Sequence, residues 1–287
     1  MPTLRAMSDP IRPEHSPDDE YWRSFLTTGK SEFEQRFRRI FGHLPTHPRC
    51  KACNAPFKGI GAPIVSILFG RSQSYTDPRF CEPCVQMARK HPGGAEIEIT
   101  MLFADIRGST TVAEDLSPAE FGRTVNRFYK AATDVLLETD AFIYRLIGDE
   151  VVGIYFEGLA GAEHARKGLE AAREILKVTG HADADGPWIP VGAGLHTGVS
   201  YVGVVGSTEG AIDITALGDV PNVAARLASL AAPGEIILSE ATRSAAGLDL
   251  PGIEKRSRSL KGRREAVETY TIYIGDGGEA TEKKTET

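Results

Sequence analysis

The sequence predicts an α+β fold, in which a ferredoxin-like βαββαβ domain follows a helical segment and a four-cysteine segment. Two observations support this class. Over residues 95–274, short apolar stretches typical of strands alternate with stretches of helical spacing, in the order β-α-β-β-α-β. Before that domain, the four cysteines of the chain are confined to Cys50–Cys84, where they form two CxxC pairs.

Length and composition indicate a soluble globular protein. The chain has 287 residues, of which 41% are hydrophobic and 25% charged, enough for one large domain or two ordinary ones. A net charge of −6 gives no electrostatic reason to expect nucleic acid or an anionic membrane as partner. No apolar run approaches the roughly 18 residues of a membrane span, and the N-terminus lacks a signal-peptide core. We therefore expect a cytoplasmic protein without a membrane span.

The chain before the predicted sheet divides into three parts. Residues 1–20 are polar and contain four prolines, so we expect them to be disordered. Residues 21–48 form a helical segment, because large apolar side chains recur at helical spacing from Tyr21 to Phe41. This segment either packs on its own chain or forms a dimer contact. Residues 49–92 form the four-cysteine module, and the Gly-, Glu- and Lys-rich tail 275–287 is expected to be disordered.

The cysteine pattern predicts a metal site. Cys50 and Cys53 precede Cys81 and Cys84 by a loop of 27 residues. Each CxxC turn points two thiolates at one ion, and four thiolates close a tetrahedral zinc site without an open position. Such a zinc ion is structural, and an iron–sulfur cluster is the alternative. Because the loop is not notably basic, we expect the module to serve folding or a regulatory protein partner.

The elements of the second domain follow from turn and cap signals. Ser117 and Glu120 form a capping box, with Pro118 at the first helical position, and predict a helix to residue 136. Strands over 141–147 and 151–156 are joined by a Gly148-Asp149-Glu150 turn. We further expect a helix over 162–176, β structure over 190–206, a strand over 212–217, a helix over 220–230 capped by Asp219, a strand over 235–238, and paired strands over 253–260 and 267–274.

Two carboxylates are expected to meet at one edge of this sheet. The apolar run 101–104 ends at Asp105, and a glycine-bearing turn follows over 107–110. Asp149, at the hairpin tip, would face Asp105, because the first strand of a ferredoxin-like sheet lies beside that hairpin. Such a pair can bind one or two magnesium ions, and free N–H groups of the turn can hold phosphate oxygens. Either aspartate alone could equally cap a turn.

A second polar pair lies on the predicted helix over 220–230. Asn222 and Arg226 are four residues apart and therefore share one face. An amide beside a guanidinium suits the ribose and phosphate of a nucleotide. The alternative is a solvated arginine on an alanine-rich helix.

Five motifs together resemble the signatures of class III nucleotidyl cyclases, the adenylate and guanylate cyclases, of bacterial type. They are LFADIRGST over 102–110, LIGDEV over 146–151, GLHTG over 194–198, TALGDVPNVAARL over 215–227 and LKG over 260–262. The resemblance places a cyclase catalytic domain over residues 95–274. It implies attack of the ribose 3′-hydroxyl of a nucleoside triphosphate, most simply ATP, on its α-phosphate. The products are a 3′,5′-cyclic nucleotide for second-messenger signalling and pyrophosphate.

The resemblance also implies roles for single residues. Asp105, Asp149 and the carbonyl of Ile106 match the ligands of two Mg²⁺ or Mn²⁺ ions per active site. Asn222 matches the residue that orients the ribose, and Arg226 matches the one that stabilises the transition state. In this family these two come from a second chain, which implies a homodimer with composite sites. The residues that match substrate-binding positions are the phosphate loop Ile106, Arg107, Gly108, Ser109 and Thr110, the terminal-phosphate lysine Lys261, and the base-contacting pair Arg145 and Thr215.

Two positions depart from the family pattern. Arg145 stands where adenylate cyclases usually have lysine, and its planar guanidinium could donate to adenine or bidentately to guanine or uracil. Guanylate and pyrimidine cyclases, including an antiphage signalling enzyme, therefore remain open, as does a non-catalytic nucleotide-sensing or scaffold module. Pro221 replaces a small apolar residue, which a first helical turn tolerates. His196 lies in an apolar strand and is expected to be structural.

Overall fold

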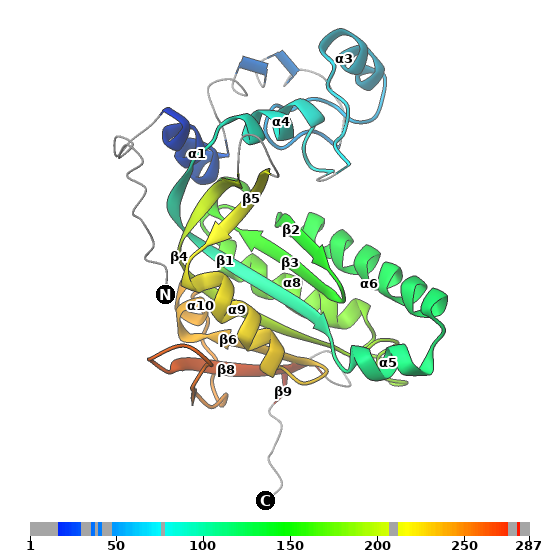
Figure 1. Cartoon of the computed structure of the whole chain (residues 1–287), viewed down its shortest axis with the longest axis vertical. Helices are drawn as coiled ribbons and strands as arrows, with labels where there is room; N and C mark the ends of the chain where they lie inside the picture. Colours follow the sequence, from blue (N-terminus) through cyan, green and yellow to red (C-terminus); the bar gives the residue numbers. More distant parts are fainter. Residues whose placement is uncertain are drawn as a thin grey trace, which may run out of the picture.

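The core of the chain is one twisted mixed sheet, seen in the computed structural model of Figure 1. The structure describes residues 17–29, 36–37, 40–41, 48–75, 78–206, 212–274 and 280–281. Within these residues the strand order is β2-β3-β1-β4-β6-β8-β7, with β5 paired to β4 and β9 to β8. The strands are β1 Gly94–Ile106, β2 Phe142–Ile147, β3 Glu150–Tyr155, β4 Val191–Gly206, β5 Ile212–Leu217, β6 Glu235–Ser239, β7 Arg256–Arg258, β8 Val267–Ile274 and β9 Ala280–Thr281.

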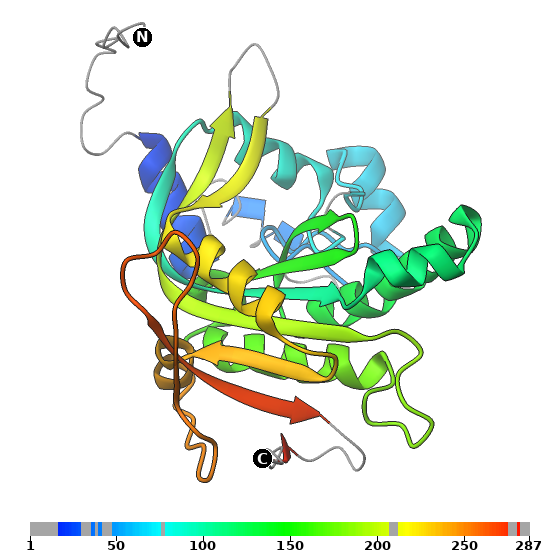
Figure 2. The same ribbon diagram turned by 60° about the horizontal axis from the view of Figure 1, so that its bottom comes forward.

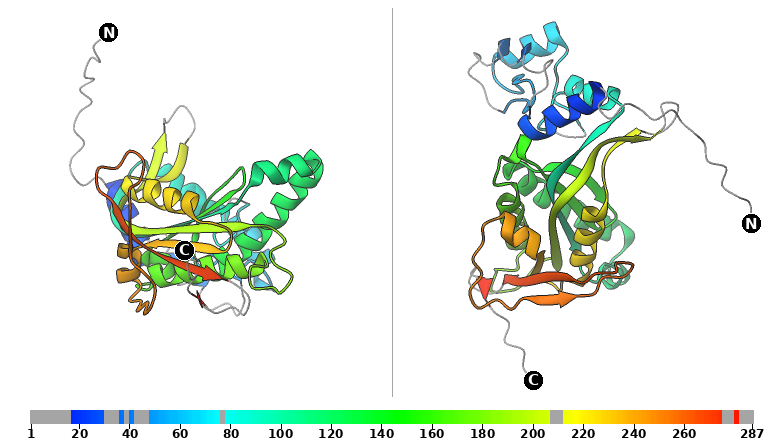
Figure 3. Two further views of the ribbon diagram at one scale, coloured as in Figure 1. Left: turned by 90° about the horizontal axis from the view of Figure 1, so that it is seen from below. Right: turned by 90° about the vertical axis from the view of Figure 1, so that its left-hand side faces the viewer.

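Helices cover both faces of the sheet (Figures 2 and 3). Alternate side chains of β1 enter two different apolar clusters, so this strand is buried on both sides. On one face the sheet packs on α6 and α8, and on the other on α9. The helices are α1 Pro17–Thr28, α3 Gly61–Phe69, α4 Glu82–Lys90, α5 Ser109–Asp115, α6 Pro118–Glu138, α7 Glu157–Ala160, α8 His164–Val178, α9 Asp219–Leu230 and α10 Glu240–Ala245.

Small residues fix the position of α9 on β4. A Cβ added at Gly194 would come within 2.1 Å of the Ala228 nitrogen, so only glycine permits this approach. Towards one end of the helix Val220 contacts Gly198, and just past the other end Ala231 contacts Gly192. The helix therefore runs antiparallel to β4, and its direction determines which of its residues lie near each end of β1.

Most predicted elements are confirmed. The capping box of Ser117 and Glu120 is present at α6, and β5 has the predicted bounds. The predicted strand over 253–260 is reduced to β7, because turns closed by Ile253 N–H to Leu250 O and by Arg263 N–H to Leu260 O flank it.

Three further differences concern helix and chain ends. The cap of α9 is Gly218 and not Asp219, whose carboxylate instead pairs with Arg263 at 2.9 Å. At the N-terminus, α1 begins at Pro17, inside the stretch expected to be disordered, and residues 1–16 lie outside the described residues. In the tail, β9 pairs with β8, and the rest of 275–287 also lies outside them.

The N-terminal segments pack directly on the sheet. Trp22 and Phe25 of α1 share one apolar cluster with the four cysteines and with residues of β1. The Trp22 indole donates to the His91 carbonyl at 3.0 Å, which ties α1 to the entry of β1. No helix among the described residues is long and apolar enough to cross a bilayer.

Helix α3 projects from the four-cysteine module (Figure 1). Several of its apolar side chains are exposed to solvent. Ile64, Ile67 and Leu68 are 53%, 82% and 70% exposed. Its last residue, Phe69, packs edge-on against Phe41, with ring centroids 5.2 Å apart. One side of α3 is therefore anchored, and the other is open.

Candidate active site and metal centre

The backbone brings Asp105 and Asp149 to one edge of the sheet. Asp105 ends β1 opposite Glu150, the first residue of β3, in the antiparallel register. The Ile106 N–H donates to the Asp149 carbonyl at 3.2 Å, which holds the hairpin tip against the end of β1. The Tyr129 hydroxyl steadies the same tip by donating to the Gly148 carbonyl at 2.8 Å. The two predicted metal residues are thus neighbours within one chain.

Glu150 adds a third carboxylate that the sequence analysis did not single out. Burial raises its pKa to about 6, and the negative charge of Asp149 adds to the rise, while Arg107 opposes it. Burial and a neighbouring carboxylate both disfavour the charged form of a carboxyl group. Its position directly after Asp149 in the GDE turn was the available signal.

Arg107 neutralises part of this charge. Its guanidinium pairs with the Asp105 carboxylate, and its Nε donates to the Asp105 carbonyl at 3.3 Å. Nη1 donates to the Ser229 carbonyl in the last turn of α9, also at 3.3 Å. Burial lowers the pKa of Arg107, and attraction to Asp149 and Glu150 opposes that change.

Part of the predicted phosphate loop is engaged within the chain. The Ile106 N–H bonds Asp149 as described, and the Arg107 N–H donates to the Pro190 carbonyl at 2.8 Å. The candidates for phosphate contact are therefore the amides of Gly108, Ser109 and Thr110, at the start of α5. First-turn amides of a helix have no partner within the helix.

Asn222 lies away from Asp105 in the same chain. Ala231, just beyond α9, contacts Gly192, which is the β4 partner of Asp105. Asn222 is nine residues earlier, about 13 Å along the helix. It is exposed, and its Nδ2 donates to the Gly218 carbonyl at 3.0 Å. One chain therefore does not bring this amide to the carboxylate edge.

Arg226 lies instead near the turn that carries Lys261, the lysine predicted to bind the terminal phosphates. Its Nη2 lies 3.5 Å from where a Cβ at Gly262 would stand, so it borders the turn that carries the exposed Lys261. The chain thus carries two separate groups of polar residues. One is the carboxylate edge, and the other lies along α9 and the 260–262 turn.

The two predicted base-contacting residues are also separated. Arg145 lies on β2, beside a register irregularity, and Thr215 lies buried on β5. Strands β3, β1 and β4 stand between β2 and β5. His196 is largely buried with its Nδ1 2.8 Å from the Ser239 hydroxyl, and burial lowers its pKa to about 4. These contacts fit the expected structural role of His196.

The four cysteines form a compact sulfur cluster. The Sγ atoms of Cys50, Cys53, Cys81 and Cys84 are buried and lie within 4.8 Å of one another, and those of Cys53 and Cys81 are 3.6 Å apart. Tetrahedral zinc with Zn–S bonds near 2.3 Å needs S···S separations of about 3.8 Å. The donor set and its spacing therefore fit a zinc ion.

Arg71, from the loop between the two cysteine pairs, is a neighbour of this cluster that was not predicted from the sequence. Its Nη1 lies 3.4 Å from the Cys84 Sγ and 3.5 Å from the Cys81 Sγ, and its guanidinium lies 3.8 Å from the centre of the Phe37 ring. Only 3% of the residue is exposed. Four thiolates with one divalent ion carry excess negative charge, so a buried guanidinium is an electrostatically suitable neighbour.

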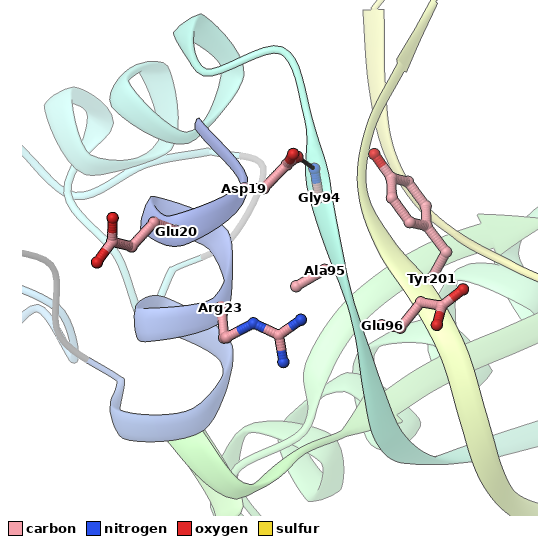
Figure 4. Close-up of a pocket in the computed structure, with 7 residues that line it drawn as sticks. All are labelled: Asp19, Glu20, Arg23, Gly94, Ala95, Glu96 and Tyr201. Carbon is pink, nitrogen blue, oxygen red and sulfur yellow. Dashed lines mark hydrogen bonds between the residues drawn. The ribbon is translucent and has the colours of Figure 1, made fainter. Parts of the chain in front are cut away.

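A separate hollow of about 760 Å³ opens between α1 and the start of β1 (Figure 4). Asp19 and Arg23 line it from α1, and Tyr201 from β4. The Asp19 carboxylate accepts the Gly94 N–H at 3.2 Å, drawn as a dashed line. Because Gly94 begins β1 and Asp105 lies near its end, this hollow is not part of the carboxylate edge.

Comparison with known proteins identifies the family of the sheet domain. Residues 94–273 match the model of the adenylate and guanylate cyclase catalytic domain. An adenylate cyclase of Anabaena cylindrica is 31% identical over 186 residues, which is 61% of this chain and 36% of that protein. The chain spans about a third of the length of the curated relatives that it matches first.

Solved structures share the fold. The adenylyl cyclase CyaB from P. aeruginosa superposes with a TM-score of 0.56 at 23% identity, over 65% of this chain and 99% of that one. The guanylyl cyclase Cya2 superposes with a TM-score of 0.56 at 24% identity, over 64% of this chain and 95% of that one. The family model matches residues 94–273, which is more than half of this chain. The chain therefore belongs to the adenylate and guanylate cyclase catalytic domain family.

Proposed function

We propose that the chain is a homodimeric nucleotidyl cyclase that converts a nucleoside triphosphate, ATP in the first instance, to its 3′,5′-cyclic nucleotide and pyrophosphate. One observation carries the proposal. The chain has both groups of polar residues that such a site needs, yet it holds them apart. Two copies related by a twofold axis could join the Asp105 edge of each to the Asn222 face of the other.

In this proposal each group has a defined task. Asp105, Asp149 and the Ile106 carbonyl would hold divalent cations, Mg²⁺ or Mn²⁺, which neutralise the triphosphate and lower the pKa of the ribose 3′-hydroxyl. Hard carboxylate oxygens at a negatively charged edge fit such cations. The amides of Gly108–Thr110 would bind phosphate oxygens.

The partner chain would complete the site. Its Asn222 would orient the ribose, and its Arg226 would bind the charge that develops on the α-phosphate. Its Lys261 would bind the terminal phosphates. Positioning and charge neutralisation account for the reaction without a dedicated protein base.

The choice of base is the second part of the proposal. Adenylate cyclases among the relatives favour ATP. Arg145 favours a second candidate, because a guanidinium can donate two parallel hydrogen bonds to the carbonyl-bearing edge of guanine or uracil. GTP and the pyrimidine nucleotides are therefore the alternatives, and Thr215 would contact the base from the other chain.

Product analysis tests both parts. The purified protein is incubated with each of the four ribonucleoside triphosphates and Mn²⁺ or Mg²⁺, and products are identified by mass spectrometry. A dominant 3′,5′-cyclic AMP product is expected. A dominant cyclic GMP, UMP or CMP product would contradict the ATP assignment. No cyclic product at concentrations where the protein is dimeric would favour a nucleotide-sensing or scaffold module.

We propose that the four cysteines hold a structural zinc ion and that residues 21–92 form a module through which a regulatory protein acts. The sulfur spacing and the shared apolar cluster with β1 support this assignment. Metal analysis tests the ion. One zinc per chain is expected, whereas iron with acid-labile sulfide would establish an iron–sulfur cluster instead.

A further inference from the structure

The Arg107 guanidinium pairs with the carboxylate through which Asp105 would hold a cation. The Nη2 atom pairs with the Asp105 Oδ2, and the two side chains are only 16% and 21% exposed. The Arg107 Nε atom donates to the main-chain carbonyl of Asp105. Arg107 thus engages the Oδ2 atom and the main-chain carbonyl oxygen of Asp105, and a metal ion bound through Oδ2 would compete for the first of these.

The carboxylates around Asp105 attract any positive charge, whether it is the Arg107 guanidinium or a metal ion. Asp149 and Glu150 lie close enough to attract the Arg107 guanidinium, and each carboxylate would attract a divalent ion in the same way. The positive charge of Arg107 already neutralises part of the negative charge that would attract a metal ion. A metal ion that binds through Asp105 Oδ2 therefore has to offset the loss of the arginine contact.

The Ser229 carbonyl gives the guanidinium a second anchor. It accepts from Nη1 at 3.3 Å and belongs to the last turn of α9. Carbonyl oxygens at a helix C-terminus carry partial negative charge and accept well from arginine. The side chain can therefore leave the Asp105 carboxylate and stay attached to α9, so its displacement does not require full exposure to solvent.

We propose that Arg107 competes with the divalent cation for Asp105 and so sets the affinity of the active site for its metal. This inference rests on the proposed function, because it takes Asp105 to be a metal ligand. Arg107 is a positioning residue in this account. Its guanidinium contacts the Asp105 carboxylate, and its N–H, expected from the sequence to face phosphate, donates to the Pro190 carbonyl.

Mn²⁺ binding measured without nucleotide tests the competition directly. The free Mn²⁺ signal in electron paramagnetic resonance is titrated against the full-length protein and its variants. Arg107→Met removes the charge and the donors while keeping most of the side-chain length. We expect it to tighten Mn²⁺ binding about tenfold, the loss of one charge-assisted contact. Arg107→Lys keeps the charge but loses the planar fork, and we expect an intermediate affinity.

Two further variants separate the possible failures. Arg166→Met removes an arginine from α8 that bonds the Ala246 carbonyl, far along the chain from the carboxylate edge, and should leave Mn²⁺ affinity unchanged. Asp105→Asn should abolish the binding. If Asp105→Asn abolishes it and Arg107→Met leaves it unchanged or weaker, the competition is wrong and the proposed function stands. If Asp105→Asn has no effect, the metal assignment in the proposed function fails. Should Arg107→Met not fold, the Arg107→Lys value decides: affinity equal to wild type overturns the competition.

Discussion

Ala228 of α9 lies directly over Gly194 of β4, with its nitrogen 2.1 Å from where a Cβ of residue 194 would stand. This contact determines how close the helix with Asn222 and Arg226 approaches the sheet. Gly194→Ala should therefore push α9 outward. We expect a loss of about 1–3 kcal/mol in unfolding free energy, as for overpacked cores, and lower cyclase activity.

Gly122→Ala is the matched control for that substitution. Gly122 lies within α6, and an added Cβ there meets nothing within 4 Å. Alanine in a helix interior should raise the unfolding free energy by roughly 0.5–1 kcal/mol. Urea denaturation of both variants gives the comparison, and equal effects would contradict the close packing of α9.

Mixing two inactive chains tests the shared site. Asp105→Ala should remove at least several kcal/mol of transition-state stabilisation, and Arg226→Ala should also be inactive. A heterodimer of the two contains one site with all groups intact. Co-expression with two affinity tags, followed by tandem purification, should therefore recover part of the wild-type rate. Purified heterodimers without activity would argue against composite sites.

Loss of one cysteine should unfold the N-terminal module. Cys81→Ser is expected to lose the bound zinc and to lower the unfolding free energy by several kcal/mol, because metal binding and folding are coupled in such sites. Ser72→Ala changes an exposed side chain in the same loop and is the control. Elemental analysis and thermal unfolding measure both effects. A Cys81→Ser protein of unchanged stability would contradict a structural metal.

Burial of His196 should make the free energy of unfolding depend on pH. Burial lowers its pKa to about 4 from the usual 6.5; the Asp219 charge opposes this shift, and Arg263 reinforces it. Between these pH values the unfolded chain binds more protons than the folded one, so the stabilisation is complete above pH 6.5 and is lost as the pH falls towards 4. His196→Asn should reduce the loss by about 2 kcal/mol. The measurement is urea denaturation at pH 7.5, 6 and 5.

His164 and His181 should account for part of the remaining acid sensitivity, because burial lowers the pKa of each. An unchanged pH profile in His196→Asn would show that His196 is already protonated in the folded chain, or that it is exposed. Equal stability of the two proteins at pH 7.5 would show that asparagine replaces the contact with the Ser239 hydroxyl.

Local signals in the sequence were sufficient for most elements. Ser117, Pro118 and Glu120 determine the start of α6 by contacts within four residues, and such contacts are visible in sequence. The cap of α9 was not predictable in this way. Asp219 would be a suitable cap by residue type, but its carboxylate pairs instead with Arg263, 44 positions further along the chain. A partner that distant has no sequence signal.

At the candidate site, too, contacts that follow from the strand order were predictable, and contacts that depend on packing were not. The position of Asp149 beside Asp105 follows from the order of the strands, so topology alone predicts it. The contact of Arg107 with Ser229 depends on how α9 lies on β4, and the approach of Arg71 to Cys84 depends on the folding of a loop between two cysteine pairs. Neither charge could be assigned a partner before the packing was known.

The solvent-facing side chains of α3 have a practical consequence for every unfolding measurement above. Ile64, Ile67 and Leu68 present apolar surface while the chain is folded. Environment-sensitive dyes bind such surface in native proteins as well as in partly unfolded ones. A high dye signal at low temperature is therefore expected from the folded chain and is not by itself a sign of damage to the fold. Circular dichroism or intrinsic tryptophan fluorescence is the better probe for this chain. Of its two tryptophans, Trp22 is 1% exposed and reports the junction of α1 with β1, and Trp188, whose indole donates to the Val178 carbonyl, reports the end of α8.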